Sequence, residues 1–124
     1  MEMGEFFRAI VDSDEGPVVI CNAEHTIVYM NPNAVKHYEK RGGAALIGTS
    51  LLNCHKTESQ SVIEAVTSWF RESKENNRVF TYRNEKEQYD VFMISLRDDN
   101  GEFIGYYERH KSTAAETSEP YYID

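Results

Sequence analysis

Three adjacent residues, Asn53-Cys54-His55, carry the side chains of this 124-residue chain that are best suited to chemistry. Cys54 offers a thiol that reacts as its thiolate, and His55 offers an imidazole that exchanges protons near neutral pH. The stretch precedes a strongly helical pattern, so we expect a helix N-terminus, with His55 and Lys56 alongside, to lower the pKa of the Cys54 thiol. These features are typical of a reversible redox or covalent sensor.

Two other interpretations of the same stretch stay open. His55 or Cys54 could supply an axial ligand to haem iron. In a purely structural role, Asn53 would cap a turn, Cys54 would be a small buried apolar residue, and His55 would be solvated or bound to backbone. A disulfide to the second cysteine, Cys21, would require the two Cα atoms to lie within about 7 Å.

The helix that would position this stretch is the clearest element of the sequence. Its apolar residues recur on one face at helical spacing: Val62, Ile63, Val66, Trp69 and Phe70. Thr57 and Gln60 have the spacing of a capping box, which predicts that the Thr57 side chain caps this helix.

The segment upstream of it predicts two more helices and two strands. The expected elements are a helix over 3–13, strands over 17–21 and 26–30 joined by a turn, a helix from Asn31 to about Arg41, and an irregular stretch over 44–56. Asn31 can accept hydrogen bonds from the free amides of the second helix, and Pro32 fits its first position.

From Arg78 onward the apolar period changes to two. Strands are predicted over 78–84, 88–96 and 102–110, with polar turns between them. The fold class is therefore α+β, with a five-stranded antiparallel sheet and helices on one face. The fourth strand is apolar on both sides at Val91–Ile94, so we expect the N-terminal helix or a second subunit to cover the other face.

The charge and the apolar content of the chain limit which classes of binding partner we expect. The chain carries 13 basic and 21 acidic residues, a net charge of −8, so we expect no nucleic-acid and no membrane partner. Because no run reaches the ~20 apolar residues of a spanning helix and no secretion signal is evident, we expect a cytoplasmic protein. We interpret 1–111 as one domain and the acidic stretch 112–124 as a tail or linker.

Enzymatic motifs are missing from the sequence. It contains no glycine-rich phosphate loop, no serine-histidine-aspartate order and no histidines at metal-binding spacing. We therefore expect neither an enzyme nor a metal site.

Three stretches in order resemble the PAS (sensory box) domain. They are VVICNAEHTIVYMNPNA at 18–34, Leu46-Ile47-Gly48, and RDDNGEFIGYYERH at 97–110. The resemblance covers about residues 5–111. It implies a curved sheet of strand order 2-1-5-4-3 with an N-terminal cap helix, which surrounds a cavity under small helices and senses a signal.

The resemblance also implies which side chains face that cavity. In the family the residue before the first turn points inward, which here is Cys21, and alternation along the strands extends the set. The ligand-binding candidates are Val19, Cys21, Tyr29, Cys54, His55, Val91, Met93 and Tyr107, with Val79, Thr81, Phe103 and Gly105 beside them. The alternative is that these side chains simply fill a solid core.

The cofactor and the partners follow from the same resemblance. The light-oxygen-voltage subclass has Gly-x-Asn-Cys-Arg, whereas Asn53-Cys54 is displaced by three residues from that spacing after Gly48, so flavin is not expected. Haem remains one candidate, and the cofactor is otherwise unknown. The implied partners are a second copy in a homodimer, a small-molecule ligand, and an output domain or partner protein such as a two-component kinase or a transcription regulator. A ligand-free dimerisation and interaction module and a cysteine-based redox sensor are the alternative functions.

Overall fold

The computed structural model describes residues 2–121 and contains the predicted five-stranded antiparallel sheet. Its elements are α1 (Met3–Asp12), β1 (Val18–Asn22), β2 (Ile27–Met30), α2 (Pro32–His37), the short 3-10 helices η1 (Glu39–Arg41), η2 (Gly43–Leu46) and η3 (Leu51–Cys54), α3 (Thr57–Glu72), β3 (Arg78–Asn84), β4 (Tyr89–Arg97) and β5 (Phe103–Ser112). The strand order β2-β1-β5-β4-β3 confirms the prediction. Residue 1 and the last three residues of the predicted tail, 122–124, lie outside the described residues.

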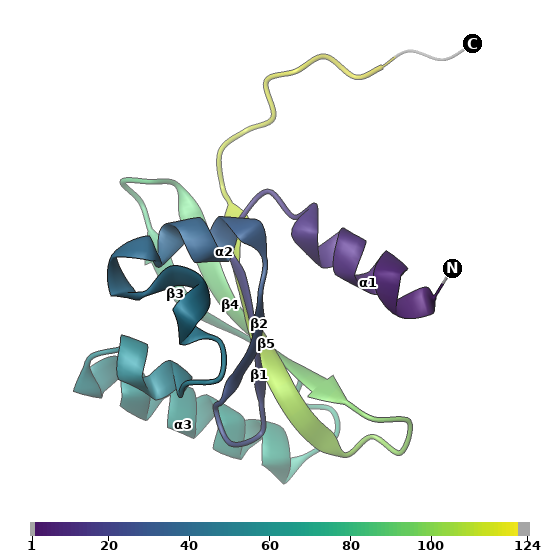
Figure 1. Cartoon of the computed structure of the whole chain (residues 1–124), viewed down its shortest axis with the longest axis vertical. Helices are drawn as coiled ribbons and strands as arrows, with labels where there is room; N and C mark the ends of the chain where they lie inside the picture. Colours follow the sequence, from purple (N-terminus) through teal and green to yellow (C-terminus); the bar gives the residue numbers. More distant parts are fainter. Residues whose placement is uncertain (1, 122–124) are drawn as a thin grey trace.

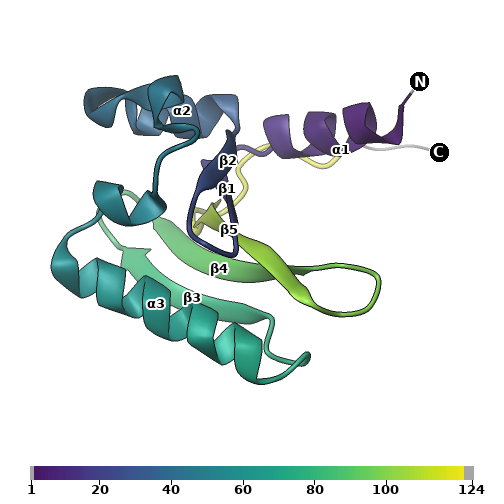
Figure 2. The same cartoon turned by 60° about the horizontal axis from the view of Figure 1, so that its bottom comes forward.

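The helices from α2 to α3 pack on one face of the sheet, here called the inner face, and α1 stands apart from it (Figures 1 and 2). The core lies between the inner face and these helices. Its central side chains are Val19, Cys21, Ile27, Met30, Leu51, Cys54, Ile63, Phe70, Met93 and Tyr106. Because β5 pairs with both β1 and β4, it occupies the middle of the sheet and contributes to every part of this core.

Three β-bulges set which side chains reach the inner face. The residues without a partner are Val28 in β2, Thr81 in β3 and Ile104 in β5. An inserted residue reverses the alternation of the strand that follows it.

Because of these bulges, the prediction that Tyr29 and Tyr107 face the cavity is wrong. Tyr29 pairs with Ile20, and Tyr107 pairs with Ile20 and Ile94, so both tyrosines lie on the outer face of the sheet. Simple alternation from Ile27 or from Phe103 would have pointed them inward, but the bulges at Val28 and Ile104 turn them outward. Tyr106 takes the inward place instead and is fully buried.

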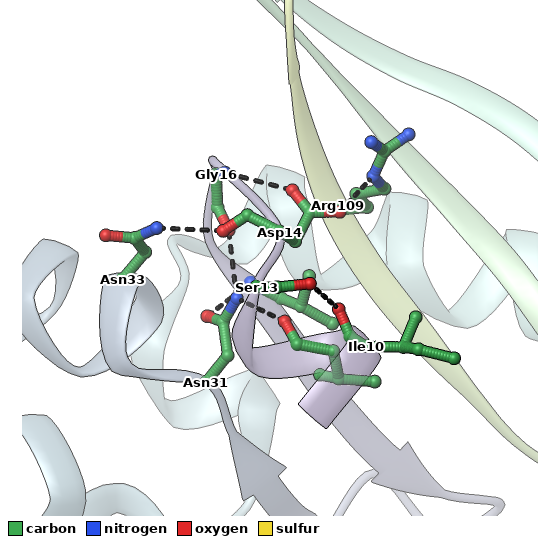
Figure 3. Close-up of polar contacts among 9 residues, drawn as sticks. Ile10, Ser13, Asp14, Gly16, Asn31, Asn33 and Arg109 are labelled. Carbon is green, nitrogen blue, oxygen red and sulfur yellow. Dashed lines mark hydrogen bonds and ion pairs between the residues drawn. The ribbon is translucent and has the colours of Figure 1, made fainter. Parts of the chain in front are cut away.

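The side chain of Asn31 joins three elements at one end of the sheet. Its Oδ1 accepts hydrogen bonds from the amides of Val18 at 2.9 Å and Ala34 at 2.9 Å, which confirms the predicted cap of α2. Its Nδ2 donates to the carbonyls of Val11 at 3.1 Å and Gly16 at 3.0 Å. This fully buried amide therefore ties the end of α1, the start of β1 and the start of α2 together (Figure 3).

The segment between α1 and β1 is also fixed to β5. Arg109 Nε donates to Asp14 Oδ2 at 2.7 Å, and Asp14 Oδ1 accepts from the Gly16 amide (Figure 3). Gly16 lies directly against the backbone carbonyl of His110, so a Cβ at this position would collide with it. We call the contacts of Asp14, Gly16, Asn31 and Arg109 the junction.

Helix α1 buries none of its residues. Its apolar side chains Met3, Phe6, Phe7 and Ile10 are 50% to 67% exposed. Its contacts with the sheet are polar, because Arg8 and Asp12 bind the hydroxyl of Tyr29. The predicted helix is therefore present, but within the described chain it does not cover the outer face of the sheet.

Replacing Asn31 by alanine is expected to destabilise the fold by about 3 kcal/mol or more, because two buried and two partly buried backbone groups lose their partner at once. Asn31→Asp keeps both acceptor bonds but sets a carboxylate oxygen against the Val11 and Gly16 carbonyls, so it is expected to destabilise the fold as well. Urea unfolding measures the difference, with Asn33→Ala as the control, because exposed Asn33 makes one bond to the Asp14 carbonyl. A loss below about 1 kcal/mol for Asn31→Ala would contradict the assignment.

Candidate functional site

A cavity of about 330 Å³ lies between α3, the end of α2 and strands β3 to β5. Its volume is at the lower end of the range of small-molecule pockets, roughly 300–1,000 Å³. The lining is mostly apolar and aromatic with a few polar groups: His37, Tyr38, His55, Ser59, Val62, Ile63, Thr81, Tyr82, Tyr89, Val91, Met93, Glu108 and His110. The inner face is thus not solidly packed over β3, β4 and the end of β5.

The most unusual group in this cavity is the carboxylate of Glu108. The residue is only 7% exposed, and its two oxygens face two imidazoles, His55 Nε2 at 3.9 Å and His110 Nε2 at 3.8 Å. Both distances exceed a hydrogen bond. Among residues 2–121 no lysine or arginine lies within ion-pair distance of Glu108, and the basic side chains beside it are the two histidines.

His110 is held in place by aromatic neighbours. Its ring stacks on Tyr89 with 4.9 Å between the centroids, and the ring of His37 meets it edge-on at 4.9 Å. Burial lowers the pKa of His37, and the nearby His110 lowers it further. The His37 imidazole therefore stays neutral at neutral pH and adds no positive charge to the cavity.

Helix α3 positions His55, but by a different route from the one predicted. The helix begins at Thr57 with Lys56 as its cap residue, and no side chain caps it, so the predicted capping box is wrong. Gln60 reaches back instead, and its Nε2 donates to the carbonyls of Leu52 at 2.8 Å and His55 at 2.9 Å. Arg41 adds a bond to the Cys54 carbonyl at 2.7 Å.

The two thiols lie in the core rather than at a reactive position. Burial raises the pKa of Cys54 and raises that of Cys21 to about 12. The expected lowering of the Cys54 pKa is wrong, because desolvation outweighs the helix N-terminus and nearby Arg41. Both cysteines are free.

The predicted ligand-binding residues divide into three groups. His55, Val91 and Met93 line the cavity. Cys21 is buried in the core, and Val19 and Cys54 border a gap too small for a water molecule. Tyr29 and Tyr107 lie on the outer face, as described above.

Sequence reasoning missed the polar centre of the cavity. Glu108 and His110 occupy alternate positions of β5 and so share a face, which was a usable signal. They were overlooked because the bulge at Ile104 reverses the alternation that starts at Phe103. His37 and Tyr89 reach the cavity from separate elements, and nothing in the local pattern brings them together.

Neither a metal ion nor haem fits the groups as they lie. Within residues 2–121, no three histidine, cysteine or acidic side chains are placed to hold a metal ion. The Nε2 atom of His55, which would bind haem iron, is fully buried without a hydrogen-bond partner and faces Glu108 at 3.9 Å. There is no room for a macrocycle between these two side chains. In the described part of the chain, no helix has the length and apolarity needed to cross a bilayer.

Comparison with known proteins gives one family and several similar structures. The sequence matches the family model described as "PAS fold" over residues 11–115. No curated protein matches it. A C-terminal domain from Streptococcus mutans has a TM-score of 0.66 at 18% identity, covering 88% of this chain and 84% of that one.

Two further solved structures come from Vibrio cholerae. The Aer2 receptor, described as a dual PAS-heme oxygen sensor, has a TM-score of 0.58 at 18% identity and covers 79% of this chain and 94% of that one. A sensory box sensor histidine kinase has a TM-score of 0.56 at 14% identity, covering 90% and 89%. At these identities the similarity demonstrates a shared fold.

Both thiols are expected to resist modification in the folded state. With the pKa of Cys21 near 12, its thiolate at pH 8 is on the order of a thousandfold scarcer than that of an ordinary thiol. Reaction with Ellman's reagent should be slow in buffer and complete in urea, and Cys21→Ala and Cys54→Ala separate the two sites. If Cys54 reacts fast with the reagent in the folded protein, the result would support a redox sensor instead.

Proposed function

Because the chain belongs to the PAS-fold family, we propose that it is a sensory module that binds a small molecule in the cavity between α3 and the sheet and relays occupancy to a partner. The observation that carries this proposal is the cavity itself, with apolar walls around one buried carboxylate, Glu108. Such a combination orients a ligand by a few polar groups within an apolar enclosure. In this proposal the domain is a binding module and not an enzyme.

The relay in this proposal is the end of β5. Glu108 and His110 face the cavity, whereas Arg109 between them faces outward and binds Asp14 of the junction. The backbone amide of His110 donates to the Pro17 carbonyl at 3.1 Å. A shift of these three residues by a ligand would therefore act directly on the segment that carries α1.

The partner that receives the signal first is, in this proposal, a second copy of the chain. The exposed apolar stripe of α1 lacks a partner within the described chain. The outer face adds half-exposed Phe80 on β3, at the sheet edge opposite to the β2 edge that α1 contacts. Pairing two such surfaces would bury both, and the output domain or regulatory partner would respond to the geometry of the pair.

A cavity-filling substitution tests ligand binding. Val91 lines the cavity and is buried, so Val91→Phe is expected to weaken the binding of small-molecule fragments at least about tenfold, or about 1.4 kcal/mol. Methyl NMR of Ile63, Val91 and Met93 locates the fragments in the parent chain. Ile104→Phe, at an exposed site of the β5 bulge outside the cavity lining, is the matched control. Equal binding to the Val91 variant would contradict the proposed site.

A charge on the apolar stripe of α1 tests the dimer. Phe7→Glu combined with Ile10→Glu is expected to shift the sedimentation of the protein to that of a monomer, because both side chains are largely exposed in one copy. Glu5→Lys changes a charge on the opposite side of the same helix and should leave the dimer intact. A dimer that survives the double substitution would place the interface elsewhere.

A further inference from the structure

The cavity has an electrostatic feature that apolar ligands would leave unsatisfied. Glu108 is 7% exposed and accepts no hydrogen bond from residues 2–121, and the basic groups of that part of the chain within ion-pair distance are imidazole nitrogens at 3.8 Å and 3.9 Å. Its oxygens are not among the enclosed polar atoms, so they border the open space of the cavity. A ligand group that supplies a positive charge or strong donors can therefore reach this carboxylate and form charge-assisted hydrogen bonds with it.

His55 closes one side of this space. Its Nε2 atom is fully buried without a hydrogen-bond partner, and Gln60 fixes the backbone of the residue. Because this nitrogen is enclosed, a ligand in the cavity would meet the Glu108 carboxylate, which His55 faces at 3.9 Å, and not Nε2 itself.

The walls around this point suit a cation better than an anion. Tyr38, Tyr82 and Tyr89 line the cavity, and aromatic faces attract ammonium groups. No lysine or arginine is among the lining residues of the described cavity. The remaining walls, with Val91 and Met93 among them, are apolar and would receive a hydrocarbon body.

From this arrangement, and building on the proposed ligand binding, we propose that the cavity selects small organic cations, in which an ammonium group binds the Glu108 carboxylate and an apolar body lies against Val91 and Met93. The ammonium would donate to the Glu108 carboxylate. The ligand would then contact Glu108 and lie beside His110, which are two of the three β5 residues of the relay.

Three isosteric probes test this selectivity: benzylammonium, benzyl alcohol and benzoate, each titrated into the full chain and followed by methyl NMR of the cavity residues. Benzylammonium is expected to bind at least about tenfold more tightly than benzyl alcohol, and benzoate weakest. Glu108→Gln is expected to abolish the preference for the ammonium while keeping the alcohol bound. Glu85→Gln, which removes a charge from the exposed β3–β4 turn, should change neither.

The outcomes separate this inference from the proposed function. If benzyl alcohol binds in the cavity as well as benzylammonium does, ligand binding stands and the cation selectivity fails. If benzoate binds best, the histidines form an anion site and the inference is overturned. If Ni²⁺ or Zn²⁺ alone shifts the His55 and His110 resonances while benzylammonium does not, the cavity takes a metal instead. Binding of no probe contradicts both proposals. The parent chain alone decides between these cases, even if Glu108→Gln does not fold.

Discussion

The bulge residue Ile104 of β5, opposite Leu96 and Arg97, determines which side chains of β5 face the cavity and which face outward. Beyond this bulge Tyr106, Glu108 and His110 turn inward, and Tyr107 and Arg109 turn outward. Without it, the two faces would exchange side chains: a cation would enter the core region and the cavity would lose its carboxylate. Both the cavity and the Asp14–Arg109 contact of the junction therefore depend on one backbone irregularity, located just before the β5 residues that pair with both β1 and β4.

Two polar sites, Asn31 on one side and Glu108 with His55 on the other, differ in how many hydrogen bonds they make. Asn31 uses both donors and acceptors of its amide on four backbone groups, so it stabilises the meeting point of α1, β1 and α2. Glu108 and His55 make no such bonds: the His55 Nε2 atom is enclosed, and the Glu108 oxygens border the cavity. Polar groups without protein partners are concentrated at functional sites, where a ligand can bind them. The Asn31 site therefore stabilises the fold, whereas Glu108 and His55 lie where a ligand could change the structure.

The sequence predicted the five strands and the capping of α2 by Asn31, because each has a local pattern: alternation, turn residues, and an Asn-Pro start. The strand order was implied by the resemblance to the PAS domain. Four of the candidates named from the sequence line the cavity: His55, Thr81, Val91 and Met93. The prediction failed at Tyr29 and Tyr107, since a bulge leaves no mark in a short strand, and at Thr57, since Gln60 binds distant carbonyls rather than the helix start. It also failed for the Cys54 pKa, because burial is a property of the fold and not of neighbouring residues.

The coupling between cavity and α1 is limited by how firmly α1 is held. An isolated helix of ten residues is marginal in water, and α1 buries none of its side chains, so the junction and whatever covers its apolar stripe decide its orientation. A ligand can change that orientation only by as much as its affinity differs between two arrangements of β5. Reversing a 1:99 population needs about 5.5 kcal/mol of such difference. A charge-assisted hydrogen bond to Glu108, at about 1.5–3 kcal/mol, would supply part of this difference, and in the proposed dimer the remainder would come from contacts between α1 and the second copy.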